Sequence, residues 1–523
     1  MQPTIILSTL NAKYSHASFG LRYLLANLGP WRAQAVLREF TINQSPMEIV
    51  EALMADRPRV IGFGVYIWNV AQTTAVIRIL RVLWPDATIV IGGPEVSYEY
   101  ERTAIFELAD HLITGEADLA FKELVDALEA GESPPKVISA ILPDVGQLVS
   151  PYTEYSDEDL AKRLIYVEAS RGCPFKCEFC LSSLDIPVRS FPLEDLLAEF
   201  KLLLDRGLRA FKFVDRTFNL NVAFSKAILE FCLDNYRPGL EFHFEMIPDR
   251  LPEALRELIA RFPEGAVQFE VGIQTFTEDV SARISRRQKI DRIEDNFAFL
   301  LEHTGVHIHA DLIFGLPGET LESFGASFDK LYALAPHEIQ MGILKRLRGT
   351  PIIRHTDEFR MKYNPLPPYE ILETSTVPFD TMTRMKRFAR YFELYHNSGN
   401  FLENMRLLQS PGAIAEGAGD LSPFYRFLSF SDWLYAETKQ THTFALTRLY
   451  KLIFMYLTEV CGIPPVTVAH ACLADYDRHD IRRARLEFLR PYVDSVAAPR
   501  GHAPQGEGHL KWGARRQTPV AQS

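Results

Sequence analysis

The stretch CPFKCEFC, from Cys173 to Cys180, carries three of the six cysteines of the chain. Their spacing is C-x3-C-x2-C, and they follow an apolar, β-rich run at 165–167 that we expect to be a strand. Three thiolates on one loop, here Cys173, Cys177 and Cys180, can hold three corners of a cubane [4Fe–4S] cluster. The fourth iron then has no protein ligand, so the stretch predicts a chemical site.

Two other interpretations of these cysteines fit less well. A structural zinc site needs four ligands, usually as two separated pairs, and no matching Cys or His pair lies nearby in the sequence. A disulfide would leave one of the three cysteines over, in a compartment that the cysteine pattern suggests is reducing. The remaining cysteines, Cys232, Cys461 and Cys472, are scattered and fit buried helix positions.

The cysteine loop opens a region in which strands and helices alternate. We expect strands at 165–167, 210–214, 241–246, 267–273, 307–314 and 338–343. Helices are expected at 193–205, 222–235, 252–262, 291–303 and 323–334. Six such units are too few for a closed eightfold barrel, so the pattern predicts a partial (β/α)6 TIM-like barrel with its site at the carboxyl ends of the strands.

The residues before this region alternate in the same way. Short apolar runs at 4–10, 35–41, 60–67, 88–91 and 111–114 are separated by helical patterns at 18–28, 46–56, 70–84, 98–108 and 119–130. Continuous apolar strands between helices predict a parallel sheet covered on both faces. The fold class is therefore α/β, with an N-terminal Rossmann-like, doubly wound domain ahead of the barrel.

Breaks in periodicity divide the chain into five segments. We expect the Rossmann-like domain at 1–132, a Gly- and Pro-interrupted linker at 133–163, the partial barrel at 164–362, a helical C-terminal domain at 369–493 and a disordered tail at 494–523. The helical domain would either pack on the barrel or cover its mouth.

Composition narrows the classes of function. The chain has 523 residues, 47% of them hydrophobic, which excludes global disorder and predicts two to four domains. Lys and Arg number 56 against 67 Asp and Glu, a net charge of −11, so nucleic acid is an unlikely partner. No apolar run reaches the length of a spanning helix, and the start lacks a basic signal region. We expect a cytoplasmic protein with no membrane partner.

The cysteine loop on a partial barrel, with Phe179 before the last cysteine, resembles the radical S-adenosylmethionine superfamily. The resemblance implies that S-adenosylmethionine chelates the open iron and is cleaved to a 5′-deoxyadenosyl radical. It also implies cofactor contacts at the ends of the second, fourth and fifth strands. The residues at those places are Asp215, Glu270, Gln274, Gly315 and Gly318.

The Rossmann-like domain ahead of such a barrel resembles the cobalamin-binding class of this superfamily. Gly92, Gly93 and Ser97 follow the fourth strand, where paired glycines let a large ligand approach the backbone. His16 aligns with the axial His of the D-x-H-x-x-G cobalamin motif, although Tyr14 and Phe19 stand in place of its Asp and Gly. No G-x-G-x-x-G follows the first strand, which makes a dinucleotide less expected.

The resemblance implies a radical S-adenosylmethionine enzyme, a cobalamin-dependent methyltransferase acting on an unactivated carbon of a small-molecule or unknown substrate. It implies an external one-electron donor of the flavodoxin or ferredoxin type. Radical rearrangement without methyl transfer stays open. One alternative is a radical methylthiotransferase, whose second cluster needs three more cysteines, yet residues 1–172 contain none. A non-enzymatic iron–sulfur or cobalamin sensor is the other.

Overall fold

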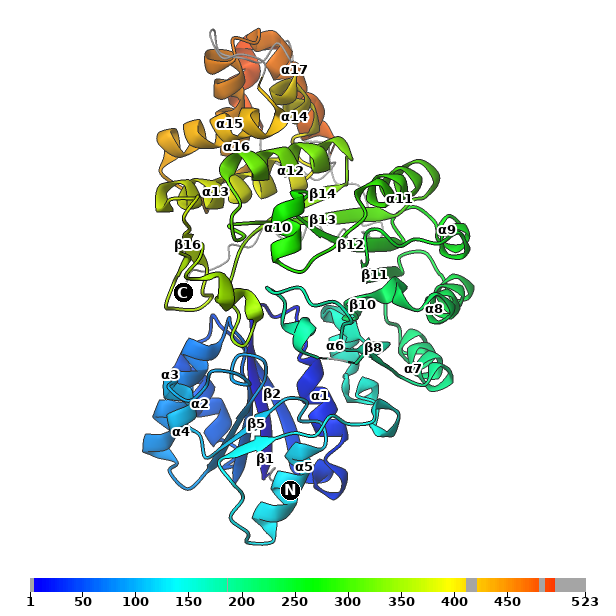
Figure 1. The fold of residues 1–523 in the computed structure, drawn as a ribbon, viewed down its shortest axis with the longest axis vertical. Coiled ribbons are helices and arrows are strands. Elements are labelled where there is room, and N and C mark those ends of the chain that lie inside the picture. Colours follow the sequence, from blue (N-terminus) through cyan, green and yellow to red (C-terminus); the bar gives the residue numbers. More distant parts are fainter. Residues whose placement is uncertain (1–3, 186, 411–420, 479–484, 494–523) are drawn as a thin grey trace.

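The computed structural model describes residues 4–185, 187–410, 421–478 and 485–493, and the tail expected at 494–523 lies outside them. Figure 1 shows three parts that follow one another along the long axis of the molecule: an α/β domain in blue and cyan, a barrel in green, and helices in yellow and orange. The predicted α/β class, with its Rossmann-like domain, partial barrel and helical part, is confirmed.

The N-terminal domain is a six-stranded, fully parallel sheet in the order β2-β1-β3-β4-β5-β6. Its strands are β1 (Ile5–Asn11), β2 (Ala35–Thr41), β3 (Val60–Gly64), β4 (Thr88–Gly92), β5 (His111–Thr114) and β6 (Val137–Ser139). The helices are α1 (Phe19–Ala26), α2 (Pro46–Met54), α3 (Val70–Leu83), α4 (Ala104–Leu108) and α5 (Ala120–Glu129). Two separate hydrophobic cores lie on its faces, because apolar strands bury side chains on both sides.

Two parts of this domain differ from the sequence expectation. The stretch 133–163, expected to be a linker, contains β6 and the short helix α6 (Asp157–Lys162). The helix expected at 98–108 begins only at Ala104. The residues before it form a loop in which Glu99 has a φ of +50° and binds the barrel. The contact of Glu99 with the barrel thus takes the place of the first helical turns, and the local sequence pattern does not reveal such a contact.

The barrel is a second parallel sheet, in the order β14-β13-β12-β11-β10-β7. Its strands are β7 (Ile165–Val167), β10 (Ala210–Phe213), β11 (Glu241–Met246), β12 (Val267–Gln274), β13 (His307–Phe314) and β14 (Glu338–Ile343). The helices are α7 (Leu193–Asp205), α8 (Val222–Asp234), α9 (Glu253–Ile259), α10 (Glu278–Arg283), α11 (Ile290–His303) and α12 (Leu321–Ala333). The six strands fall within a residue or two of their predicted positions, and β7 and β14 are the edges of an open barrel.

Alternation along the barrel strands separates an apolar from a polar face. Phe211, Phe213, Phe242 and Phe244 are buried, and their rings stack from strand to strand beneath the helices. The intervening residues carry polar and charged side chains that meet one another across the other face. The barrel interior is therefore polar, which suits a site.

The helical part packs directly on the barrel. Its helices are α13 (Phe379–Phe392), α14 (Leu402–Gln409), α15 (Pro423–Thr438), α16 (Leu446–Met455) and α17 (Pro465–Asp477). A single hydrophobic core runs from the barrel into these helices, through contacts such as that of Phe328 with Phe388 and Phe424. Two short strands, β15 (Lys362–Tyr363) and β16 (Ile371–Glu373), form a hairpin between the two parts. None of the described helices has both the length and the apolarity to cross a bilayer.

Acidic loops of the N-terminal domain meet arginines of the barrel. After β4, Glu95 accepts a hydrogen bond of 3.0 Å from Arg348. After β5, Glu116 and Asp118 bind Arg171, which lies on the short strand β8 (Ser170–Arg171). Because these loops follow the carboxyl ends of parallel strands, that edge of the sheet faces the barrel.

Candidate active site

The cysteine loop leaves the barrel directly after β7 and is held at its base. β8 pairs in antiparallel fashion with β9 (Arg189–Ser190), which closes the loop on itself. Gly172, just before the first cysteine, has a φ of +89°, and a Cβ there would lie 2.7 Å from the carbonyl oxygen of Pro187. Only glycine fits this turn. The Cys173 amide then donates to the Asp185 carbonyl at 3.0 Å.

All three cysteines line one pocket of about 290 Å³ at the carboxyl ends of the barrel strands. Arg286, from the segment after α10, lies with Nη1 3.3 Å from Sγ of Cys177. This guanidinium places a positive charge beside the sulfur atom that would bind iron. Among the described residues no three His, Cys, Asp or Glu side chains are close enough to bind one metal ion. In a cubane each thiolate binds a different iron, so these residues fit a [4Fe–4S] cluster.

Glu270 and Gln274, on the inner face of β12, line the same pocket. Glu270 Oε2 lies 2.9 Å from His243 Nε2 and 3.5 Å from Lys212 Nζ. Burial disfavours its carboxylate, but these two partners outweigh burial and lower the pKa of Glu270. It is therefore an anion at neutral pH. Gln274 has a φ of +72°, and its Oε1 is buried without a hydrogen-bond partner in the part of the chain described.

The pocket also contains residues that the sequence analysis missed. Asp311, from β13, is partly buried; desolvation raises the pKa of its carboxyl group, and its Oδ1 lies 3.4 Å from His309 Nε2. Arg216 and Glu245 form a 2.8 Å ion pair at the pocket wall. Asp311 and Glu245 could have been found from the alternation of inward- and outward-facing residues along their strands. This alternation identifies them only once it is known which face of the sheet points into the barrel.

Asp215 lies beside the cysteine loop, outside the lining of the pocket. Its carboxylate accepts hydrogen bonds from the Ala169 amide at 2.9 Å and from the Ser170 hydroxyl at 2.6 Å. Burial raises the pKa of Asp215 to about 6 in spite of these bonds. Its contacts hold the segment that leads from β7 to Cys173.

Gly315 and Gly318 also lie outside the pocket lining. They have φ values of +93° and +77°, and added Cβ atoms would collide with Ile371 and with Arg283. The Gly315 amide donates to Glu319 Oε2 at 2.9 Å. The structure thus explains these glycines by tight turns and close packing.

A second pocket, of about 270 Å³, lies at the carboxyl edge of the N-terminal sheet. Gly92 and Gly93 form part of its wall, with Gly62 and Gly64 of β3 and apolar residues of α1. Gly93 has a φ of +111°, and a Cβ there would lie 2.6 Å from the Val65 carbonyl oxygen. The Ser97 hydroxyl donates to the Gly93 carbonyl at 2.9 Å and so fixes the loop, without lining the pocket itself. We call this cavity the glycine pocket.

The glycine pocket reaches the domain boundary. Its rim includes Glu168 and Arg171 of the barrel, and Arg171 lies two residues before Cys173. The segment from Arg171 to Cys173 therefore contributes to both pockets.

His16 lies away from the glycine pocket lining. Its Nδ1 is 2.6 Å from the hydroxyl oxygen of Tyr166 on β7, and the two rings stack. His16 and Leu164, the residue before β7, also form an isolated parallel β-bridge. The structure thus brings His16 to the barrel and Gly92 and Gly93 to the pocket.

Comparisons with known families agree with this architecture. Residues 6–125 match the B12 binding domain, residues 167–331 match the Radical SAM superfamily, and residues 357–495 match a family described as "Protein of unknown function (DUF4080)". The chain thus joins a B12-binding domain to a radical S-adenosylmethionine domain, and the predicted resemblance is confirmed. It is an enzyme of the radical S-adenosylmethionine type, whose cofactors are a [4Fe–4S] cluster, S-adenosylmethionine and cobalamin. Such enzymes need an external electron donor.

Individual relatives are distant. An uncharacterized methyltransferase of Pyrococcus horikoshii is 24% identical over 353 residues, covering 59% of this chain and 74% of the relative. The ribosomal protein uS12 methylthiotransferase RimO of Chlamydia caviae is 23% identical, covering 47% of this chain and 54% of the relative.

Two solved structures share the fold. The radical S-adenosylmethionine methyltransferase TsrM of Kitasatospora setae, with cobalamin and a [4Fe–4S] cluster bound, has a TM-score of 0.58 at 18% identity, covering 72% of this chain and 82% of TsrM. The cobalamin-dependent radical enzyme OxsB, with aqua-cobalamin bound, has a TM-score of 0.58 at 13% identity, covering 91% of this chain and 79% of OxsB.

Proposed function

We propose that this enzyme is a cobalamin-dependent methyltransferase that acts on an unactivated carbon of a small molecule. One observation carries the proposal. Arg171 lines the glycine pocket and is two residues from Cys173, so the cobalamin-binding domain and the cluster loop meet at one place. The similarity to the P. horikoshii methyltransferase and to TsrM supports the same reaction.

Each pocket has a distinct task in this proposal. When bound, the cluster and S-adenosylmethionine supply a carbon-centred radical oxidant, and cobalamin supplies a methyl group. Cys173, Cys177 and Cys180 would hold the cluster. The anionic Glu270 and the unpartnered amide oxygen of Gln274 suit the ammonium and ribose hydroxyls of S-adenosylmethionine.

The remaining predicted residues would act by shaping the backbone. Gly92 and Gly93 leave room for the cobalamin tail, with Ser97 holding their loop. Gly315 and Gly318 would shape the turn beside the adenine, and Asp215 would position the cluster loop. His16 is the residue that the sequence suggests as a cobalt ligand, but its 2.6 Å hydrogen bond with Tyr166 and its position outside the glycine pocket disfavour that role.

We further expect a flavodoxin- or ferredoxin-type protein as the electron donor and a reducing, cytoplasmic setting, because the cluster thiolates must stay reduced. The net charge of −11 disfavours nucleic acid as the substrate.

The test is anaerobic purification and reconstitution, followed by iron, sulfide and cobalamin analysis and incubation with S-adenosylmethionine and a chemical reductant. We expect about four irons and one cobalamin per chain, and release of 5′-deoxyadenosine and S-adenosylhomocysteine. A Cys177→Ala variant should lose the cluster. An intact cluster without cobalamin would refute methyl transfer, and absence of 5′-deoxyadenosine would favour the sensor.

The methylthiotransferase alternative predicts different stoichiometry. Such an enzyme holds a second cluster, so it would contain about eight irons per chain. The absence of cysteine from residues 1–172 leaves no ligands of that kind in the N-terminal domain. The same iron analysis therefore distinguishes the two enzymes.

A further inference from the structure

A third cavity, of about 650 Å³, lies at the opposite end of the barrel from the cysteines. Its walls come from the loop after β1, from the end of α6, and from the starts of β10 and β11. Its lining includes Lys13, His16, Arg163, Arg209, Lys212 and Glu241. We call it the basic pocket. Its volume is in the range of small-molecule sites.

The charge of this pocket contrasts with that of the chain. Five cationic side chains and the carboxylate of Glu241 line it. Lys162, Arg163 and Lys212 already form ion pairs with carboxylates, so Lys13 and Arg209 supply the excess of positive charge, in a chain whose net charge is −11. Arg209 is exposed and stands at the mouth, whereas the Lys212 side chain, 21% exposed, lies deeper on the inner face of β10. A concave surface with such an excess of cations attracts anions.

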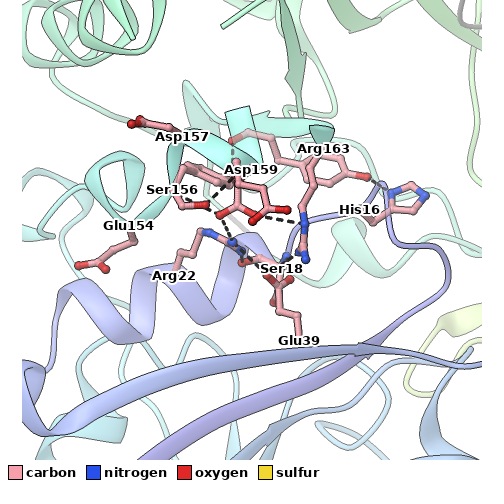
Figure 2. A network of polar contacts seen from close by, with 12 residues as sticks. His16, Ser18, Arg22, Glu39, Glu154, Ser156, Asp157, Asp159 and Arg163 are labelled. Atoms are coloured by element: carbon pink, nitrogen blue, oxygen red, sulfur yellow. Dashed lines mark hydrogen bonds and ion pairs between the residues drawn. The ribbon is translucent and has the colours of Figure 1, made fainter. Parts of the chain in front are cut away.

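One wall of the basic pocket is fixed in place. Arg163 is bound by Glu39 at 2.8 Å and by Asp159 at 3.2 Å, and His16 is bound by Tyr166. Figure 2 shows Arg163 and His16 within the network that joins the two domains through Arg22 and Glu39. Side chains held in this way lose little rotamer entropy when a ligand binds.

The basic pocket adjoins the cysteine pocket. Lys212 lines the basic pocket, and its Nζ lies 3.5 Å from Glu270 Oε2, which lines the cysteine pocket. The Lys212–Glu270 ion pair thus links the walls of the two cavities.

We propose that the basic pocket binds the anionic group, a carboxylate or phosphate, of the substrate. The rest of the substrate extends past the Lys212–Glu270 pair, so that its reacting carbon reaches the cysteine pocket. This inference rests on the proposed function, and it adds the substrate class: a small organic acid or phosphate ester that enters from the amino-terminal end of the barrel.

The test uses two probes, inorganic pyrophosphate and citrate, titrated by calorimetry into the reconstituted, cobalamin-loaded protein. We expect one equivalent of at least one probe to bind. The double variant Lys13→Gln/Arg209→Gln should weaken binding by about tenfold or more, because it removes two charge-assisted contacts. The control Lys201→Gln/Arg261→Gln removes the same charge from exposed positions outside the pocket and should change binding less than about twofold.

The outcomes separate the sources of the anion and the possible failures. Binding of pyrophosphate alone indicates a phosphate ester, and binding of citrate alone indicates a carboxylate. The proposal would be overturned if neither probe binds, if both double variants bind equally well, or if binding is seen only before cobalamin is loaded. Release of 5′-deoxyadenosine by the wild-type protein tests the proposed function separately, so the two can fail independently.

Discussion

The Glu178 carboxylate lies 2.8 Å from Nε2 of His355, and its other oxygen accepts a 2.7 Å hydrogen bond from the Ser285 hydroxyl. Glu178 lies between Cys177 and Phe179 in sequence and is buried. Its side chain therefore ties the cluster loop to two segments that follow β12 and β14. A carboxylate between two cysteines positions the loop without facing the metal site.

We predict that Glu178→Ala weakens cluster retention by about tenfold, since residues that orient metal ligands typically contribute this much. The measurement is iron and sulfide per chain after reconstitution and gel filtration. Lys176→Ala, at an exposed neighbouring position, is the matched control and should retain the cluster. Equal iron in both variants would show that the backbone alone holds the loop.

Gly20 of α1 provides a way to fill the glycine pocket without backbone strain. It lies on a helix and lines the pocket, and the nearest atom to an added Cβ is the Tyr66 hydroxyl at 3.9 Å. We predict that Gly20→Leu projects its side chain into the pocket and lowers cobalamin per chain by about tenfold, a loss of about 1.4 kcal/mol.

The control is Gly20→Ala, which adds only a methyl group and favours the helix by up to about 1 kcal/mol. It should keep cobalamin, and its melting temperature should equal or slightly exceed that of the wild type. Full cobalamin content in the leucine variant would place the cofactor elsewhere.

Most of the fold was predictable because its signals are local. The strands of the N-terminal sheet are continuous apolar runs, and the barrel strands alternate apolar with polar residues. β7 and β10 to β14 therefore appear where expected, whereas the two-residue strands β8 and β9 were not predicted. The three-residue strand β6 was not predictable, because its sequence, VIS, is short and half-buried. Its pairing with β5 supplies the hydrogen bonds that make it a strand. The loop before α4 was not predictable either, because Glu99 binds Gly349, which lies 250 residues further along the chain.

The site was predictable where chemistry depends on spacing along the chain. The cysteine loop and the glycine pair met this condition, and each lines a pocket. The role of Asp215 could not be predicted in this way. A carboxylate at a strand end can contact a cofactor or accept hydrogen bonds from a neighbouring loop, and Asp215 accepts one from the Ala169 amide. Arg286 and Asp311 arrive from distant segments, and only the folded barrel brings them to Cys177 and Glu270.

Glu319 gives a prediction on pH. Burial raises the pKa of its carboxyl group to about 8, and the hydrogen bonds from the Gly315 and Leu316 amides only partly oppose this. Because the folded-state pKa lies above the unfolded one, the protonated carboxyl favours folding below about pH 4.5, and this contribution is lost as the pH rises through about 8. The cost reaches several kcal/mol, at about 1.4 kcal/mol per pKa unit.

Glu319→Gln removes the ionisable group and keeps an oxygen for the Gly315 amide. We expect it to raise the melting temperature at about pH 9 and to leave it nearly unchanged at about pH 5. Differential scanning calorimetry at both values measures this difference. An equal shift at the two pH values would show that shape, not ionisation, governs the position.

Whether His16 binds cobalt can be decided by one measurement. Its Nδ1 lies 2.6 Å from the Tyr166 hydroxyl, and its ring forms part of the basic pocket and not of the glycine pocket. A histidine held against the barrel edge in this way is poorly placed to bind cobalt above the N-terminal sheet. We therefore predict that His16→Ala retains cobalamin and that the electron paramagnetic resonance spectrum of its cobalt(II) form matches that of the wild type. A nitrogen coupling present in the wild type and absent from the variant would instead make His16 the axial ligand, and Tyr166→Phe, which removes only the hydroxyl, would then show whether the hydrogen bond tunes it.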